Sequence, residues 1–257
     1  MDSPISAIII TLNESKNISE CIDSLRWCRE IIVVDSGSTD DTVARARDAG
    51  ARVHITEDWP GFGIQKNRAL ALATQPWILS IDADERVSPA LAHEIQMAIA
   101  ENNRFDAYAV PRLSSYCGQY MRHGGWYPDV IVRLFRRGKA RFSDALVHES
   151  VQVQGAIGRL HHHLYHESFH DLEQVLVKLN AYSTTGAQMM LRDNRSSGVL
   201  TALMHGWWTF IRCYVLKLGF LDGRLGYVLA MSNAHGAYYR YLKLWLINKK
   251  RSQEKQG

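Results

Sequence analysis

Carboxylates are concentrated directly after one of the most apolar runs of the chain, in WILSIDADERVSP (residues 77–89). The bulky run 77–81 is followed at once by Asp82, Asp84 and Glu85. Neighbouring carboxylates repel one another, and burying them without partners is costly. A group of this kind therefore needs either a bound cation or a solvated turn.

The chemistry that suits these acids is the binding of a metal ion that in turn holds phosphate. The sequence contains neither GxGxxG nor GxxxxGK[ST], which excludes the two common glycine-rich phosphate loops. A diphosphate would instead be held by a divalent cation on Asp82 or Asp84, with the cation bridging phosphate oxygens. Because carboxylate oxygens are hard ligands, we expect Mg²⁺ or Mn²⁺.

The elements that must position these acids are strands and helices in alternation. Apolar runs predict strands at 5–10, 30–35, 51–56 and 77–82, and the segments between and after them predict helices at 13–28, 41–50, 64–75 and 88–102. This alternation is typical of βαβ units in a parallel sheet. Three polar segments (11–14, 35–40 and 82–85) follow predicted strands. Because ligands of such sheets bind beyond the carboxyl ends of the strands, we expect one small-molecule site there.

The pattern changes after residue 103. Short apolar runs up to about residue 160 predict strands or extended loops of a mixed sheet, whereas 171–193 and 198–246 are predicted to be helical. His205, Arg212 and Lys217 interrupt the first part of the second helical stretch, which argues against a membrane span. The run HHHLYHESFH (161–170) is rich in histidine, but we interpret its triple histidine as exposed rather than as a zinc site.

The C-terminal stretch also predicts contact with a membrane surface. Aromatic and methionine side chains at 189, 190, 207, 208 and 245 occur there together with many lysines and arginines, ending in the basic segment 243–255. This combination suits an anionic bilayer surface. It is also compatible with ordinary helix packing and a solvated terminus.

Composition limits the class of protein. A chain of 257 residues that is 46% hydrophobic and 22% charged is globular rather than disordered. Its formal net charge of only +4 does not indicate a nucleic-acid partner. The four cysteines form no CxxC pair, and MDSPISAIII lacks the basic segment of a secretory signal. We therefore expect reduced, structural cysteines and a cytoplasmic location.

Four motifs give the sequence a family resemblance. TLNE (11–14), VVDSGSTDDT (33–42), QKNRAL (65–70) and DADE (82–85) resemble, in order and spacing, the nucleotide-binding half of inverting family 2 glycosyltransferases. DWPGFGIQKN (58–67), VHE (147–149) and GFLDG (219–223) are similar to the subfamily of lipopolysaccharide-core β-glucosyltransferases, which add a sugar to inner-core heptose.

The resemblance implies a GT-A fold, an α/β architecture with a mostly parallel sheet flanked by helices. A nucleotide-sugar-binding half at 1–102 and an acceptor and catalytic half at 103–170 would form this domain. A helical, membrane-associating extension would follow at 171–257.

The resemblance also assigns a donor site for a UDP-sugar. It implies that Asp35 accepts a hydrogen bond from the uracil, and that Thr11 and Glu14, in one segment with Asn13, lie against the base and ribose. Lys66 matches a basic position that faces the donor. Leu12 departs from the family pattern, since many relatives have an aromatic residue there to stack on the base.

The remaining roles implied by the resemblance concern the metal and the general base. Asp84 would bind the metal, Asp82 would contact ribose or metal, and His166 would reach the diphosphate or the metal. An inverting transfer needs a base that deprotonates the acceptor hydroxyl. The motif D-x-x-VHE favours Glu149 as that base, with Asp144 as the second candidate.

Other residues near this base, and the base itself, have further roles to consider. His148 would orient the catalytic site. Glu149 is also compatible with a salt bridge at a strand edge. Lys178 and Tyr182 are compatible with the same cleft or with a structural role.

Together these observations predict a metal-dependent enzyme that moves a hexose, glucose from UDP-glucose, to a heptose of the lipid A-core acceptor. The enzyme would lie peripherally on the inner membrane, at its cytoplasmic face. The alternatives are transfer to another lipid-linked glycan, of a capsule or exopolysaccharide, and a non-catalytic nucleotide-sugar-binding scaffold. A nucleotidyltransferase would need a glycine-rich phosphate loop after the first strand, and TLNESKN (11–17) lacks one.

Overall fold

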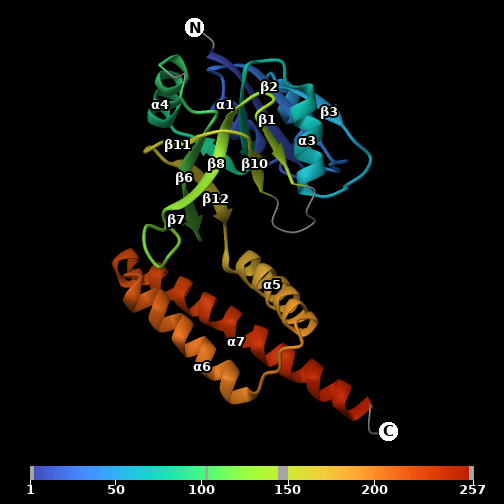
Figure 1. Cartoon of the computed structure of the whole chain (residues 1–257), viewed down its shortest axis with the longest axis vertical. Helices are drawn as coiled ribbons and strands as arrows, with labels where there is room; N and C mark the ends of the chain where they lie inside the picture. The colour runs from blue at the N-terminus through green and yellow to red at the C-terminus, as the bar shows by residue number, and fades with distance from the viewer. Residues whose placement is uncertain (1–2, 102–103, 144–149, 255–257) are drawn as a thin grey trace. The chain divides into compact units, whose positions relative to one another are not determined.

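The computed structural model describes residues 3–101, 104–143 and 150–254. The chain divides into two compact units (Figure 1). Unit 1 comprises Met1–Arg112 and Asp129–His166, and unit 2 comprises Leu113–Pro128 and Glu167–Gly257. The predicted donor half (1–102) falls in unit 1, whereas the predicted acceptor half (103–170) is divided between the two units; the functional division stays a prediction.

The first part of unit 1 is the predicted series of βαβ units. Its four strands are parallel neighbours in the order β3-β2-β1-β4, with bounds β1 (Ser3–Thr11), β2 (Cys28–Asp35), β3 (Arg52–Ile55) and β4 (Trp77–Asp82). The accompanying helices are α1 (Ile18–Asp23), α2 (Thr42–Asp48), α3 (Phe62–Leu72) and α4 (Pro89–Ala100). The prediction of parallel βαβ units over this part of the chain is therefore confirmed.

The rest of the sheet corrects the expectation of a mostly parallel arrangement. β8 (Asp129–Arg136) runs antiparallel to β4, and β6 (Ala107–Tyr116) runs antiparallel to β8. The sheet continues through β12 (Leu164–Phe169) to β5 (Glu85–Val87), with β7 (Gln119–Tyr120) and β11 (Ile157–Arg159) on β6. β6, β7 and β8 follow one another without an intervening helix, and such connections allow antiparallel pairing, whereas α4 lies between β5 and β6 in the chain. A separate pair is formed by β9 (Ala140–Phe142) and β10 (Val151–Val153).

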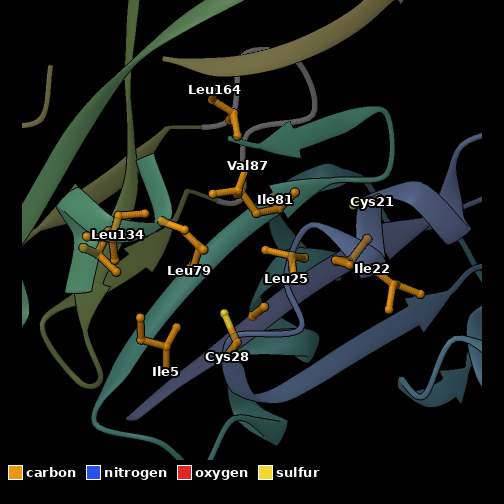
Figure 2. Close-up of a cluster of buried hydrophobic side chains, with 14 of the residues drawn as sticks. Ile5, Cys21, Ile22, Leu25, Cys28, Leu79, Ile81, Val87, Leu134 and Leu164 are labelled. Atoms are coloured by element: carbon orange, nitrogen blue, oxygen red, sulfur yellow. The ribbon is translucent and has the colours of Figure 1, made fainter. Parts of the chain in front are cut away.

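One core cluster of unit 1 lies on the face of the sheet that α1 covers (Figure 2), and a second, which includes Ile8 of β1 and Ala69 of α3, lies on the other face. Ile5 and Leu79 on the sheet, and Ile22 and Leu25 in and just after α1, are at most 1% exposed. Cys21 belongs to the same cluster, and burial raises the pKa of its thiol well above the ordinary range. The four cysteines are free, as predicted.

Unit 2 is mainly helical, which confirms the prediction for residues 171–193 and 198–246. It contains α5 (Leu172–Arg192), α6 (Val199–Ile211), a π-helical segment η1 (Arg212–Leu216), a 3₁₀ segment η2 (Gly219–Asp222) and α7 (Gly223–Glu254). Helices α5 and α6 both pack against α7. Within the described part of the chain, no helix combines the length and the apolarity that crossing a membrane requires.

Candidate functional site

The three polar segments predicted to share one edge of the sheet do meet there. Thr11 at the end of β1 is in register with Asp35 at the end of β2, which is in register with Ile55 of β3. On the other side of β1, Ile10 is in register with Asp82 at the end of β4. The carboxyl ends of four neighbouring parallel strands therefore bring residues 11–14, 35–40 and 82–85 to one rim.

The loops after β1 and β2 hold each other in place through Asn13. Its backbone N–H donates to Oγ of Ser38 at 2.8 Å, and its side-chain Oδ1 accepts from the N–H of Thr39 at 2.9 Å. Asn13 adopts a φ of 57°, which asparagine tolerates better than most residues. The side chain predicted to bind the nucleotide is thus already engaged in shaping the loop.

Asp35 is completely buried and organises the turn that follows β2. Its Oδ1 accepts from the backbone N–H of Gly37 at 3.0 Å and of Ser38 at 2.8 Å, and its Oδ2 accepts from Oγ of Ser38 at 2.5 Å. Gly37 has a φ of +87°, a conformation that favours glycine. A carboxylate has about four acceptor positions, so these bonds leave capacity for a further donor.

Thr11 presents a buried polar atom that needs a partner. The residue is 4% exposed, and its Oγ1 has no hydrogen-bond partner among the described residues. An unsatisfied buried hydroxyl is costly, and it lies at the end of β1 beside Asp35. A ligand group or a water molecule at this rim would satisfy it.

Asp82 is enclosed by two cations of the protein. Nζ of Lys66, on α3, lies 2.9 Å from Oδ1, and a guanidinium nitrogen of Arg133, on β8, lies 2.5 Å from Oδ2. Burial by itself would raise the pKa of Asp82, but the charges of Arg133 and Lys66 outweigh it and hold this pKa well below its usual range. Asp82 therefore stays ionised.

Glu85 is buried and has a structural role. It is fully buried, and its Oε2 accepts from the backbone N–H of Asp82 at 2.9 Å. Its Oε1 contacts the guanidinium of Arg133 at 2.5 Å and that of Arg112 at 3.3 Å. Two of the three acids at the end of WILSIDADE, Asp82 and Glu85, therefore form ion pairs with cations of the protein itself.

The two arginines were not predicted from the sequence. Arg133 lies inside the run VIVRLFRR (130–137), and its side chain is only 7% exposed. A charged residue inside a strand-forming apolar run is the signal that would have identified it, because such a residue needs a buried partner. Its partners are 48 and 51 residues away in the chain, so no local pattern could name them.

Asp84 meets His166 across the adjoining strands. His166 on β12 is in antiparallel register with Glu85 on β5, and this pairing sets its Nε2 at 3.3 Å from Oδ2 of Asp84. The side chains are partly accessible, at 15% for His166 and 26% for Asp84. The structure therefore brings together two residues predicted to bind metal, from positions far apart in the sequence.

This pair has the donor chemistry of a partial metal site. A carboxylate oxygen and an imidazole nitrogen both suit Mn²⁺, and the carboxylate suits Mg²⁺. Among the described residues, no group of three or more His, Cys, Asp or Glu side chains is arranged to hold an ion. An ion on Asp84 and His166 would therefore complete its shell with phosphate oxygens and water, which is usual for ions that act on nucleotides.

The comparisons with known proteins decide the family. The model of glycosyl transferase family 2 matches residues 6–193. The chain belongs to glycosyl transferase family 2. The mixed α/β sheet with flanking helices is the GT-A-like architecture expected from the resemblance.

Several relatives of this family 2 glycosyltransferase match nearly the whole chain. A lipopolysaccharide core biosynthesis glycosyltransferase of Rhizobium meliloti, LpsC, is 32% identical, covering 94% of this chain and 92% of LpsC. An uncharacterized glycosyltransferase of Rickettsia felis is 33% identical, covering 93% of this chain and 89% of the relative.

Solved structures are similar to part of the chain. One of them, glucosyl-3-phosphoglycerate synthase from Mycobacterium tuberculosis in complex with Mn²⁺, UDP and glucosyl-3-phosphoglycerate, is 30% identical. The similarity covers 44% of this chain and 43% of the synthase, with a TM-score of 0.37. A score that low does not establish a shared arrangement of the elements.

Asp144, His148 and Glu149, for which catalytic roles were predicted, lie outside the described residues. The ends of their segment are described. The backbone N–H of Ser143 donates to the carbonyl of Ser150 at 2.9 Å. Just before it, Phe142 exchanges two hydrogen bonds with the side chain of Asn67, at 2.9 and 3.0 Å. Asn67 follows Lys66 on α3, so the segment starts beside the site of this family 2 glycosyltransferase.

Proposed function

We propose that this family 2 glycosyltransferase moves glucose from UDP-glucose to a heptose of the lipopolysaccharide inner core, with inversion of the donor linkage. The observation that carries the proposal is the Asp84–His166 pair, set next to the Lys66–Asp82–Arg133 cluster at the carboxyl ends of the strands. The similarity to LpsC over nearly the whole chain supports the class of acceptor.

The nucleotide would bind at the ends of β1 and β2. Thr11 supplies a buried hydroxyl without a partner in the described structure, and Asp35 supplies a fixed carboxylate with acceptor capacity for the uracil N–H. Leu12, which is 44% exposed, offers the base an apolar contact in place of a stacking ring. Glu14 would reach the ribose.

The diphosphate would be held through a divalent ion on Asp84 and His166. When bound, Mg²⁺ or Mn²⁺ would neutralise the negative charge that develops on the UDP leaving group. Asp82 has both carboxylate oxygens in ion pairs with Lys66 and Arg133, so we assign it to fixing these cations and contacting the ribose. Lys66 is thereby held at the site with its charge close to the donor.

The transfer itself needs a general base on the acceptor side. We assign this role to Glu149, with Asp144 as the second candidate; the described residue Phe142, just before them in the chain, is hydrogen-bonded to Asn67 of α3. The acceptor oxygen would attack the anomeric carbon as Glu149 takes its proton, and the bond from that carbon to the UDP oxygen would break. Attack from the face opposite UDP converts the α linkage of the donor into a β linkage.

The acceptor would be the lipid A-core molecule, which places the enzyme peripherally at the cytoplasmic face of the inner membrane. Support for this location comes from the similarity to LpsC and from the basic, aromatic character of the C-terminal helices. Transfer to another lipid-linked glycan would use the same donor site and differ only in the acceptor.

The test combines donor binding with transfer. UDP-glucose, UDP-galactose and UDP-N-acetylglucosamine are titrated calorimetrically into the full-length protein, with and without Mn²⁺. We expect selective, Mn²⁺-dependent binding of UDP-glucose, which Asp84→Asn weakens at least about tenfold. Glu149→Gln should keep this binding and lose transfer to purified lipid A-core acceptor, with a β-linked product from the wild type.

The control is Asp23→Asn, which removes an exposed acid of α1 that pairs with Arg26 and should change neither property. Full transfer by Asp84→Asn would refute the metal assignment. Donor binding by the wild type without transfer to any lipid-linked acceptor would refute the enzymatic function and favour the scaffold alternative.

A further inference from the structure

Helix α6 packs against its neighbour through small residues. Ala202 and Gly206 lie on its buried face. A Cβ atom at Gly206 would lie only 3.1 Å from Cβ of Tyr238 and 3.3 Å from the carbonyl oxygen of Ala234, both on α7. The two helices therefore approach closely because the face of α6 that meets α7 carries little side-chain volume.

The large apolar residues of α6 point the other way. Leu200 is 70% exposed and Trp207 is 69% exposed. We define the α6 apolar face as the exposed large apolar residues from position 200 to position 221: Leu200, Leu203, Met204, Trp207, Trp208, Val215, Leu216, Leu218, Phe220 and Leu221. Spacings of three and four residues align those of α6 along one side of the helix. A contiguous apolar surface of this kind marks an interaction site.

The charged residues of the chain segment that carries this face are almost all basic. From residue 194 to residue 253 the only acidic residue is Asp222. It is 8% exposed, with its carboxylate bonded to the imidazole of His123 at 2.8 Å. The basic residues of the same stretch are Arg195, Arg212, Lys217, Arg224, Arg240, Lys243, Lys249, Lys250 and Arg251. Arg212, the first residue of η1, and Lys217, which follows η1, are both exposed and lie in the chain between members of the α6 apolar face.

An exposed apolar face could bind a second copy of the chain or a lipid bilayer, and the basic residues beside it favour the bilayer. In a symmetric dimer the same patch meets itself, so a second copy would bring Arg212 and Lys217 against like charges. A bilayer with anionic headgroups accepts the apolar side chains and attracts the basic ones. Since no described helix could span a membrane, the helix would lie in the plane of the interface.

We propose that the α6 apolar face, with Arg212 and Lys217, embeds in the headgroup region of an anionic bilayer. The inference deepens the proposed function and rests on it for the identity of the membrane, which would be the one carrying the acceptor. The physical claim stands on the exposed side chains alone, and it is tested without donor or acceptor.

The experiment is vesicle flotation of the full-length protein. The vesicles contain phosphatidylethanolamine with or without phosphatidylglycerol. We expect binding to the anionic vesicles that falls as the salt concentration rises. Leu203→Gln combined with Trp207→Gln should weaken it at least about tenfold. Arg212→Gln combined with Lys217→Gln should weaken it by a similar factor.

The matched control is Met97→Gln on α4, which removes a 45% exposed apolar side chain from unit 1 and should leave flotation unchanged. Quenching by brominated lipid gives a second measurement, in which Trp207→Phe should keep flotation and lose part of the quenching. Equal flotation of the Leu203/Trp207 variant and the wild type would overturn the proposal. So would a wild type that ignores vesicles and forms dimers that this variant dissociates.

These outcomes are separable from failure of the proposed function. The flotation assay contains no sugar nucleotide, and titration of the same variants with UDP-glucose and Mn²⁺ reports on the donor site alone. Normal donor binding with lost flotation would identify a defect of the docking surface only.

Discussion

Replacing Arg133 with methionine should destabilise unit 1 through the acids that it neutralises. Its guanidinium is 7% exposed and lies 2.5 Å from carboxylate oxygens of both Asp82 and Glu85. Methionine fills much of the same space without a charge. The variant therefore leaves two carboxylates, one of them fully buried, with less compensation than they have in the wild type.

The size of the effect follows from the partners that remain. Removing one member of a buried ion pair costs about 3–5 kcal/mol. Asp82 keeps Lys66 at 2.9 Å, and Glu85 keeps Arg112 at 3.3 Å, so the loss should lie near the lower value, about 3 kcal/mol. That corresponds to roughly 100-fold more frequent opening of the local structure.

Hydrogen exchange of peptides from β4 and β8 measures this change in unit 1 alone. The control is Arg26→Met, which breaks an exposed ion pair with Asp23 and should change the free energy of opening by less than about 0.5 kcal/mol. Unchanged exchange in the Arg133 variant would refute the view that the ion pairs of Arg133 with Asp82 and Glu85 stabilise unit 1.

The pH dependence of this prediction has a definite sign. Although burial opposes it, Arg133 and Lys66 hold the pKa of Asp82 below its unfolded value. This stabilisation is therefore complete above the unfolded pKa of about 3.9 and is lost only as the pH falls through the lower folded pKa. In the variant Asp82 takes up a proton more readily, because one of the two cations that lower its pKa is gone. The stability difference between wild type and variant should be full at neutral pH and shrink in acid.

Two further predictions concern the helix contact and the base site. Gly206→Val should lower the free energy of unfolding of unit 2 by about 1–3 kcal/mol, because its Cβ would lie 3.1 Å from Cβ of Tyr238. Thermal unfolding of the variant measures this change. An unchanged melting temperature would contradict the close approach of α6 and α7. Leu12→Tyr should tighten UDP binding about fivefold, since a stacked ring contributes about 1 kcal/mol or more. Calorimetric titration with UDP measures the affinity. Equal affinity of variant and wild type would mean that the base does not lie against residue 12.

Elements fixed by local chemistry were predictable from the sequence. The helix predicted at 88–102 begins with Ser followed by Pro, a local start signal, and Oγ of Ser88 accepts from the backbone N–H of Leu91 at 3.1 Å. The apolar runs predicted the parallel strands β1, β2 and β4 for a similar reason, because most of their residues are buried and strands covered on both faces are continuously apolar.

The first helix shows where local reasoning fails. It was predicted to start at residue 13, but α1 begins at Ile18. The backbone N–H groups of Asn13 and Ser15 donate instead to side chains of Ser38 and Asp40, 25 residues along the chain. A distant loop therefore competes successfully with the helix for these donors, and only the folded sheet brings that loop near.

The charges around DADE show why a group of acids could be recognised while its internal roles could not. Asp82 and Glu85 are paired with fixed cations, and Arg112 also pairs with Asp129 at 2.6 Å. Among the described residues, three bases (Lys66, Arg112 and Arg133) meet three acids (Asp82, Glu85 and Asp129) in this network. Asp84 stands outside it, facing an imidazole.

On the proposed function, this balance has a consequence for the order of binding. The negative charge of Asp84 would repel a diphosphate that arrived alone, whereas a divalent ion on Asp84 and His166 reverses the local charge before the donor binds. Metal and UDP-sugar should therefore increase each other's affinity by the same factor, as thermodynamic linkage requires. An acid cluster serves this purpose only because protein cations neutralise all but one of its members.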